Sequence, residues 1–166
     1  MKQLIFSLLA VMLATTLNAA ELKPVGDDFV NPGLKLSDLQ GQSHDLEQYK
    51  GSVVLLQYWA TYCTPCRKEM PSMNRLMKKM GDTPFKILAV DMSEPKADVQ
   101  AFVDEVKPEF TILLDEQGES IGQWKVFAAP ANFIIDPEGK VRYTLFGGVE
   151  WDSDEMVAVL KDLAAQ

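Results

Sequence analysis

One stretch decides the fold of this chain: Trp59-Ala60-Thr61-Tyr62-Cys63-Thr64-Pro65-Cys66-Arg67-Lys68-Glu69-Met70-Pro71. It continues a nearly unbroken apolar run, residues 53–59, which predicts a strand buried on both faces. It then enters a helical pattern that reaches Met80 and ends at Gly81, because glycine is common just past a helix end. The two cysteines are therefore expected where a buried strand gives way to a helix.

This position favours disulfide chemistry at Cys63. The first turn of a helix has unsatisfied N–H groups and a partial positive charge, which stabilise a thiolate. The thiolate is the attacking species in thiol chemistry. Pro65 fits in the first turn, where its missing N–H costs no hydrogen bond. Cys66 is near enough in sequence to close a disulfide with Cys63, so one cysteine can attack a substrate disulfide and the other can resolve the mixed disulfide.

Other uses of the two cysteines fit less well. A purely structural disulfide here would close a very short loop and constrain the unfolded chain little. Haem attachment needs Cys-x-x-Cys-His, and the next residue is Arg67. Zinc needs four ligands, and His44, which we expect at the surface, is the single histidine. We therefore expect no metal and no cofactor besides the Cys63–Cys66 pair itself.

Strands and helices alternate along the rest of the chain. Residues 21–33 are expected to form an extended arm, and Asp45 with Gln48 a capping box on a short turn ended by Gly51. A hairpin turn is expected over residues 136–139. The predicted strands are 34–40, 85–92, 110–114, 132–135 and 141–146, and the predicted helices 96–106, 119–124 and one that opens near Asp152 or Ser153. This alternation predicts an α/β layered fold with an antiparallel edge.

The N-terminus has the layout of a cleavable signal peptide. Lys2 is followed by an uncharged, mostly apolar run at 4–17, and charge returns at Glu21. We expect removal of residues 1–20, with cleavage near Ala19-Ala20, and one domain over 21–166 in the periplasm. The alternative is an uncleaved anchor, but a spanning helix needs about 20 apolar residues. No other stretch is long enough, so no stable membrane insertion is expected after cleavage.

The charge balance excludes two classes of partner. The chain has 16 Lys and Arg against 24 Asp and Glu, a formal net charge of −8. It lacks the basic footprint of a nucleic-acid binder, so no nucleic acid is expected as a partner. Anionic membrane surfaces would repel it.

The residues from Trp59 to Pro71 resemble the active-site segment of exported thioredoxin-like proteins of the TlpA/ResA/DsbE branch. The agreement runs from about Leu34 to the C-terminal helix, through 53–58, 85–91, Ala129-Pro130 and 133–136. The resemblance implies a thioredoxin fold, that is, a three-layer α/β/α arrangement with a mixed central sheet, an N-terminal β-hairpin extension and a central insert. It also implies thiol–disulfide oxidoreductase activity at Cys63 and Cys66.

The resemblance also assigns roles around the cysteines. Pro130 would be the cis-proline that faces them, and the backbone of Ala129 would pair with an extended substrate. Glu69 would take part in proton handling. The chain departs from thioredoxin at Gln57, where thioredoxin has a buried aspartate; glutamine cannot take a proton from Cys66, so Glu69 or water has to do so. The remaining substrate-binding residues are expected to be Trp59, which packs beneath the motif, Tyr62, which is partly exposed, Thr64 and Pro65.

We therefore predict a periplasmic thiol–disulfide oxidoreductase that reduces disulfides of exported proteins, with apocytochrome c as the substrate that the resemblance implies. Cys-Thr-Pro-Cys lacks the histidine that many oxidants carry before the second cysteine, and its proline resembles the reducing members. A reductant outside the cytosol must itself be re-reduced, which implies a membrane thiol electron donor.

Three alternatives stay open at this point. The first is a dithiol oxidase or isomerase of the same fold, which a reduction potential would distinguish. The second is a peroxiredoxin-type thiol peroxidase, which uses a lone peroxidatic cysteine in a different local motif. The third is a copper-binding chaperone, which would want Cys-x-x-x-Cys and a later histidine; none follows Cys66. The methionines of the predicted helix are expected to pack in the core: Met70, Met73, Met77 and Met80.

Overall fold

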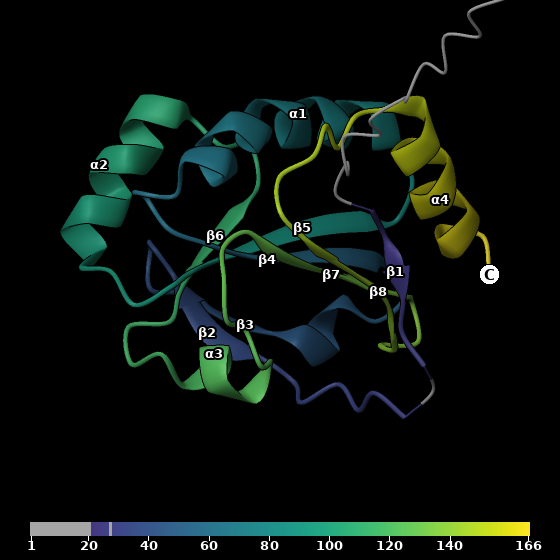
Figure 1. Ribbon diagram of the computed structural model, residues 1–166, viewed down its shortest axis with the longest axis horizontal. Helices are drawn as coiled ribbons and strands as arrows, with labels where there is room; N and C mark the ends of the chain where they lie inside the picture. The colour runs from purple at the N-terminus through teal and green to yellow at the C-terminus, as the bar shows by residue number, and fades with distance from the viewer. Residues whose placement is uncertain (1–20, 27) are drawn as a thin grey trace, which may run out of the picture.

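The structure, a computed structural model, describes residues 21–26 and 28–166, and the predicted signal peptide lies outside these residues. Within the described chain, eight strands form one mixed sheet in the order β1-β8-β7-β4-β5-β6-β2-β3 (Figure 1). β4, β5 and β6 are parallel, whereas β7 pairs antiparallel with β4 and β8 with β7. The strands are β1 (Lys23–Pro24), β2 (Lys35–Asp38), β3 (Ser43–Asp45), β4 (Val53–Trp59), β5 (Phe85–Asp91), β6 (Thr111–Leu114), β7 (Ala131–Ile135) and β8 (Val141–Phe146).

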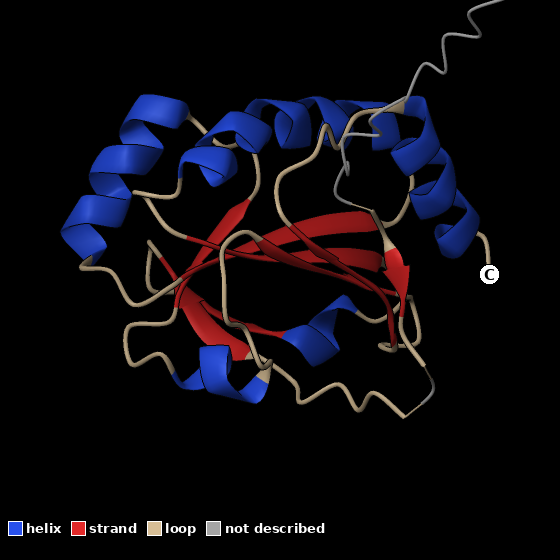
Figure 2. Cartoon of the chain, viewed as in Figure 1, coloured by secondary structure: helices blue, strands red, loops and turns tan. Residues whose placement is uncertain are grey.

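Helices cover both faces of this sheet. Three of them, α1 (Thr64–Met80), α2 (Lys96–Val106) and α4 (Asp154–Ala164), lie on one side, and the short α3 (Glu119–Gln123) and the 3-10 turn η1 (Leu46–Tyr49) lie on the other (Figure 2). The predicted α/β/α layering and the N-terminal hairpin, β2–β3, are thus both present, and β2 joins the hairpin antiparallel to β6. No helix in the described part of the chain is long and apolar enough to span a membrane.

The central strand β4 is buried on both faces, as its composition predicts. Side chains alternate along a strand. Val53, Leu55 and Trp59 therefore pack in the cluster that contains the methionines of α1, while the even-numbered positions pack against Trp124 on the opposite side. The same alternation turns the polar side chain of Gln57 toward α1.

The helix α1 begins and ends where the sequence predicts. Cys63 is the N-cap, its sulfur accepts the backbone N–H of Cys66 at 3.3 Å, and Pro65 lies in the first turn. Gly81 ends the helix with φ 54, a left-handed value that favours glycine. The helix continues through Pro71 as one element, and its methionines pack in the core as expected, with Met77 only partly buried.

Two expectations for the N-terminal third are corrected. Part of the extended arm, Lys23–Pro24, is a strand paired with β8. His44 is not a surface residue: its ring lies between Asp38 Oδ2, at 2.9 Å, and the Tyr49 hydroxyl, at 2.6 Å. The pairing of β1 with β8 joins segments far apart in the chain, whereas His44 is enclosed by residues of its own hairpin and of the turn that follows it. The capping box of Asp45 and Gln48 is confirmed.

Candidate active site

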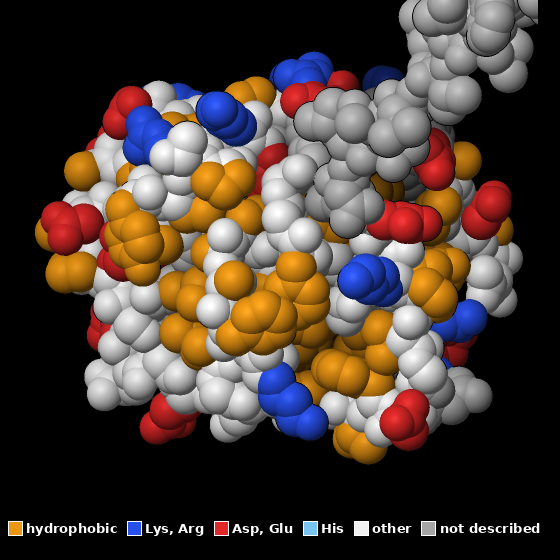
Figure 3. Space-filling model, viewed as in Figure 1, with side chains coloured by type: hydrophobic (Ala, Val, Ile, Leu, Met, Phe, Trp, Pro, Cys, Tyr) orange, Lys and Arg blue, Asp and Glu red, His pale blue; other side chains and the backbone are white. Residues whose placement is uncertain are grey.

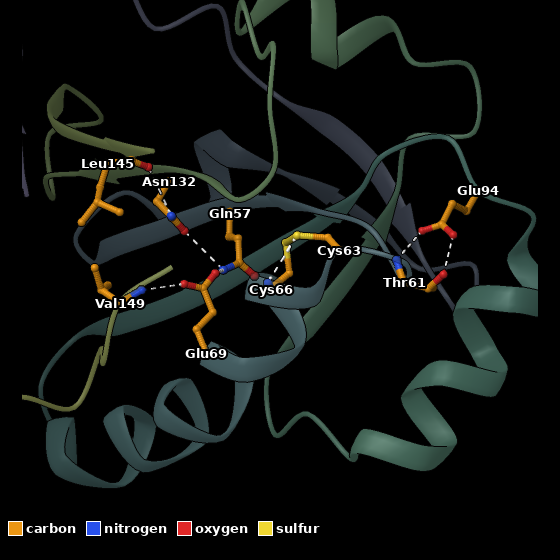
Figure 4. The surroundings of a disulfide bond; sticks show 9 residues. All are labelled: Gln57, Thr61, Cys63, Cys66, Glu69, Glu94, Asn132, Leu145 and Val149. Atoms are coloured by element: carbon orange, nitrogen blue, oxygen red, sulfur yellow. Dashed lines mark hydrogen bonds between the residues drawn. A yellow bond between two sulfur atoms is a disulfide. The ribbon is translucent and has the colours of Figure 1, made fainter. Parts of the chain in front are cut away.

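Cys63 and Cys66 form a disulfide at the carboxyl end of β4, where α1 begins (Figure 4). Their Cα atoms are 5.3 Å apart. Cys63 is 8% exposed, whereas Cys66 is completely buried. Cys63 is therefore the sulfur that another molecule can reach, and it lies at the helix N-terminus, where backbone N–H groups stabilise a thiolate.

The carboxyl group of Glu69 is buried next to this pair, one helical turn after Cys66 (Figure 4). The side chain is only 2% exposed. One of its oxygens accepts the backbone N–H of Val149 at 3.1 Å and the other accepts the amide of Gln57. Burial raises the pKa of Glu69 to about 8, and the bond from Val149 offsets part of that rise. A carboxyl with such a pKa can take up and release a proton near neutral pH.

Gln57 and Asn132 connect Glu69 to the sheet. They face each other in the register of β4 and β7, so their side chains lie on the same face. The Gln57 amide nitrogen donates to Glu69 and, at 3.3 Å, to Asn132 Oδ1, and Asn132 donates to the Leu145 carbonyl at 3.2 Å. Gln57 thus uses its N–H groups to hold the Glu69 carboxyl in place. The sequence drew attention to Gln57, but it did not predict a role for Asn132.

Solvent reaches Glu69 through a small cavity of about 220 Å³. Gly148 makes this arrangement possible, since a Cβ there would lie 3.3 Å from the Pro65 carbonyl oxygen and 3.4 Å from Glu69 Oε2. The absence of a side chain lets the loop after β8 approach the first turn of α1. The cavity is lined by Pro65, Lys68, Glu69, Gly148, Val149 and Glu150.

Pro130 directly precedes β7, and the Ala129–Pro130 peptide bond is cis. The Pro130 carbonyl accepts the Gly147 N–H at 2.9 Å, which ties this loop to the end of β8. Pro130 itself is buried and Ala129 is half-buried, while Thr64 and Pro65 at the helix start are exposed. Thr64 and Pro65 directly follow Cys63 in the chain, and Tyr62 directly precedes it.

Trp59 is the exception among the expected substrate contacts. Its side chain is fully buried and packs on Phe102, with the ring centroids 4.7 Å apart. It therefore supports the motif from beneath and presents no surface to a substrate. Trp59 is buried because it is the last residue of β4, a strand that is buried on both faces.

Three aromatic side chains are exposed in the turn after β4, in the loop before β7 and at the end of β8, and two of them were missed in the sequence. Tyr62 is 77% exposed, as expected beside the motif, and Phe127 is 80% exposed. Phe127 stacks on Phe146, with centroids 4.7 Å apart. Figure 3 shows hydrophobic side chains gathered near the middle of the face that it presents. Phe127 lies three residues before Pro130, a position that could have drawn attention to it; Phe146 gave no local signal.

A second group of carboxyls, also missed, lies on the other side of the motif. Glu94 accepts the Thr61 N–H at 2.6 Å and the Thr61 hydroxyl at 2.5 Å (Figure 4). The Glu94 N–H in turn donates to the buried Asp91 at 2.9 Å. Burial and the nearby charge of Glu94 raise the pKa of Asp91 well above the usual range of an aspartate.

The redox group of the site is the disulfide itself. Among residues 21–26 and 28–166, no three His, Cys, Asp or Glu side chains are grouped as metal ligands. A cysteine pair can accept and release two electrons by disulfide exchange without another group.

Comparisons with known proteins agree with this chemistry. The AhpC/TSA family matches residues 25–144. Thiol-disulfide oxidoreductase ResA of Geobacillus thermodenitrificans is 36% identical over 150 residues, which cover 89% of this chain and 86% of the relative. ResA of Geobacillus kaustophilus is 39% identical over 119 residues, 70% of this chain and 67% of the relative.

Comparison with solved structures gives the same result. The crystal structure of a putative thiol:disulfide interchange protein DsbE from Chlorobium tepidum superposes with a TM-score of 0.74 at 30% sequence identity, over 80% of this chain and 94% of that one. The described geometry, with its reachable and buried cysteine at the start of α1, fits the activity in these names. The chain therefore belongs to the AhpC/TSA family of thioredoxin-like proteins and is a thiol–disulfide oxidoreductase similar to ResA and DsbE.

Proposed function

We propose that the protein works as an exported disulfide reductase in which Cys63 attacks the substrate and Cys66 resolves the mixed disulfide. One observation carries this assignment: of the two cysteines at the start of α1, only Cys63 has accessible surface, while Cys66 is buried with Glu69. The attacking sulfur must be reachable, and the resolving sulfur needs to reach only its partner.

The reaction balances as two exchanges. The Cys63 thiolate bonds to one sulfur of the substrate disulfide, and the other substrate sulfur leaves as a thiolate that takes up a proton. The Cys66 thiol then loses its proton and attacks Cys63, so the Cys63–Cys66 disulfide forms and the second substrate thiol is released. Two electrons and two protons pass to the substrate.

Glu69 is the proposed acceptor of the Cys66 proton. It lies on the same side of α1, one turn away, and Gln57 holds its carboxyl from β4. Its raised pKa means that its ionised form is a stronger base than an ordinary glutamate. Gln57 and Asn132 act as positioning residues for this carboxyl.

The electrostatics around the pair support the reducing direction. Strong oxidants stabilise their reduced form. Here Glu94 lies beside the turn that leads to Cys63, while Arg67 on the first turns of α1 is engaged by Glu105 at 2.7 Å and lies over Phe102. Negative charge beside a cysteine disfavours its thiolate and hence the reduced form.

The substrates that we propose are exported proteins with a disulfide in an accessible segment, including apocytochrome c on the ground of the family resemblance. Tyr62, Thr64, Pro65, Ala129 and Pro130 would border the bound segment. The exposed pair of Phe127 and Phe146 would extend this border with apolar surface. Export through the N-terminal signal peptide, and re-reduction by a membrane thiol donor in the periplasm, complete the proposal.

Trapping tests this function. In a Cys66→Ser variant the attack by Cys63 proceeds but resolution cannot, so the variant should hold its substrates as mixed disulfides. Mass spectrometry of the complexes from periplasmic extract should identify exported proteins linked to Cys63. The matched control is the double variant Cys63→Ser with Cys66→Ser. If the single and double variants captured the same proteins, the assignment of Cys63 as the attacking sulfur would be wrong.

A further inference from the structure

Glu94 holds the turn that presents Cys63. The turn runs from Ala60 to Cys63, and the Cys63 N–H closes it by donating to the Ala60 carbonyl at 3.1 Å. In its middle, Thr61 gives both its backbone N–H and its hydroxyl to the two oxygens of Glu94, at 2.6 Å and 2.5 Å. Glu94 comes from the connection between β5 and α2. A carboxylate from a distant segment therefore fixes both donors of a residue two positions before the attacking cysteine.

Asp91 holds Glu94 in turn. It is the last residue of β5 and is buried, and one of its oxygens accepts the Glu94 N–H at 2.9 Å. Its other oxygen, Oδ2, has no hydrogen-bond partner among the described residues. A buried, unpartnered carboxylate oxygen is costly, which favours a proton on Asp91 and leaves the negative charge on Glu94.

None of the Lys, Arg and His side chains that the structure describes forms an ion pair with Asp91 or Glu94. The Asp115 carboxylate, after β6, accepts the N–H groups of Glu119, Ser120 and Ile121. Arg67 is bound to Glu105. The titratable and charged groups on the nearby parts of the adjoining elements are Cys63, Arg67, Lys68 and Glu69 at the start of α1, Asp115 and Glu116 after β6, and Lys96 and Asp98 at the start of α2. Of these groups, Cys63 is the one whose ionisation affects the redox reaction, because its thiolate attacks the substrate.

Resting on the proposed attack by Cys63, we propose that Glu94 is a positioning residue, supported by Asp91, that anchors the turn before Cys63 and disfavours the Cys63 thiolate. Two Cα–Cα steps of 3.8 Å separate Thr61 from Cys63, so the Glu94 charge lies within roughly 12 Å of the Cys63 backbone. At such separations a unit charge changes an ionisation equilibrium about 3- to 10-fold at the effective dielectric of a protein surface. Strong oxidants of this kind stabilise their reduced form. The Glu94 charge works in the opposite direction, because it destabilises the thiolate of the reduced Cys63–Cys66 pair.

The test is the pH dependence of Cys63 alkylation by iodoacetamide in the fully reduced protein. In Glu94→Gln the charge is lost and the shape kept, so the apparent pKa of Cys63 should fall by about half a unit to one unit. Thr61→Val removes the hydroxyl bond but keeps the charge and should not lower it. Glu138→Gln, in the exposed turn between β7 and β8, removes the same charge far from the site and should change nothing.

A second variant covers the case in which Glu94→Gln does not fold. Glu94→Ala removes the same charge together with both bonds to Thr61, so the apparent pKa of Cys63 should again fall. Asp91→Asn keeps an oxygen for the Glu94 N–H and leaves the Glu94 charge in place, so it should not lower the pKa of Cys63. An unchanged or raised pKa in a folded Glu94 variant would overturn the role of Glu94. Reduction of insulin by the wild-type protein separates the two proposals: if it proceeds, the proposed exchange stands even when the role of Glu94 fails.

Discussion

Two buried carboxyls at opposite ends of the sheet, Asp136 and Glu69, have very different surroundings. Asp136 follows β7, and it accepts the N–H groups of Glu138 and Lys140 at 3.1 and 2.8 Å. Arg142 adds a charged donor at 3.1 Å. Glu69, beside the disulfide, accepts one backbone N–H and one side-chain amide, and none of the Lys, Arg and His residues in the described part of the chain forms an ion pair with it.

The difference separates a structural carboxylate from a chemical one. Burying a charge is costly unless hydrogen bonds and an opposite charge offset the loss of water. At Asp136 both are present, and the carboxylate organises the β7–β8 hairpin. At Glu69 the compensation is incomplete, so its pKa is raised to about 8 and its proton becomes exchangeable near neutral pH. Incomplete compensation next to a redox pair is typical of a functional group.

The largest expected effect is the loss of the Cys63 sulfur, which makes the attack in the proposed mechanism. Cys63→Ser should abolish disulfide reduction, because serine cannot supply the attacking thiolate. The assay is insulin reduction with dithiothreitol as donor, corrected for the donor alone. Asp136→Asn is the matched substitution at the structural carboxylate and should retain the wild-type rate; a comparable loss in that variant would remove the distinction between the two ends.

The pH dependence of stability should follow from Glu69. Its pKa is raised from 4.5 to about 8 on folding. The unfolded chain therefore ionises first, and the free energy of unfolding should fall as the pH rises from about 4.5 to about 8. The loss from this group is at most about 5 kcal/mol. Denaturant unfolding of the oxidised protein measures it, since the disulfide cysteines do not titrate.

Glu69→Gln is the control for that measurement. It should remove roughly half of the pH dependence, because Asp91, whose pKa is raised to about 7, contributes with the same sign. A variant whose stability fell as steeply as that of the wild type would show that Glu69 is not the group responsible.

The same substitution should slow catalysis. Without a carboxylate to take the Cys66 proton, resolution of the mixed disulfide should slow by about 100-fold, a common size for the loss of a general base. Single-turnover oxidation of the reduced protein by a peptide disulfide measures this step. The wild-type rate should rise with pH through about 8, and this inflection should be missing in the variant. A rate equal to the wild type would leave water as the proton acceptor.

Asp136→Asn should affect stability instead. Asparagine offers one carbonyl oxygen in place of two, so part of the hydrogen bonding and the pair with Arg142 are lost. The expected cost is about 2 kcal/mol, read from denaturant unfolding at neutral pH. If stability were unchanged while the pH profile of Cys63 alkylation moved, the assignment of Asp136 to structure would be incorrect.

The smallest expected effect is at the exposed aromatic pair. Phe127→Ala removes the ring that stacks on Phe146 and should raise KM for an unfolded protein substrate about 3-fold, with kcat unchanged. A small disulfide such as oxidised glutathione, too short to reach Phe127, should be reduced at the wild-type rate. Equal losses with both substrates would indicate a disturbed active site and no substrate contact.

The cysteine motif and the order of elements could be predicted because their signals are local. Strand alternation, the N-cap position and Gly81 lie within a few residues of what they determine. The roles of Gln57 and Glu69, in contrast, depend on contacts between distant segments. Glu69 could be placed on the Cys66 side of the helix, but its burial depends on the loop at Gly148 and on the register that sets Asn132 beside Gln57.

Most of the misses are contacts between segments that are separate in the sequence. Glu94 lies 33 residues from Thr61 in the chain. Phe146 meets Phe127 only because β8 pairs with β7, and His44 is enclosed by Asp38 and Tyr49 through the hairpin. None of these contacts leaves a pattern in the local sequence. A polar residue inside an apolar strand, such as Asn132, was the one signal that closer attention to strand composition would have found.

The central claim is that Cys63 and Cys66 cycle as a reducing pair, and a redox titration tests it most directly. The protein is equilibrated at pH 7 in buffers of reduced and oxidised dithiothreitol or glutathione, quenched with an alkylating agent, and the free thiols are counted by mass. We predict one two-electron transition with a midpoint more negative than about −200 mV, in the range of reducing members of the fold. A pair that never changed state, or a midpoint near about −120 mV as in strong oxidants, would contradict the account.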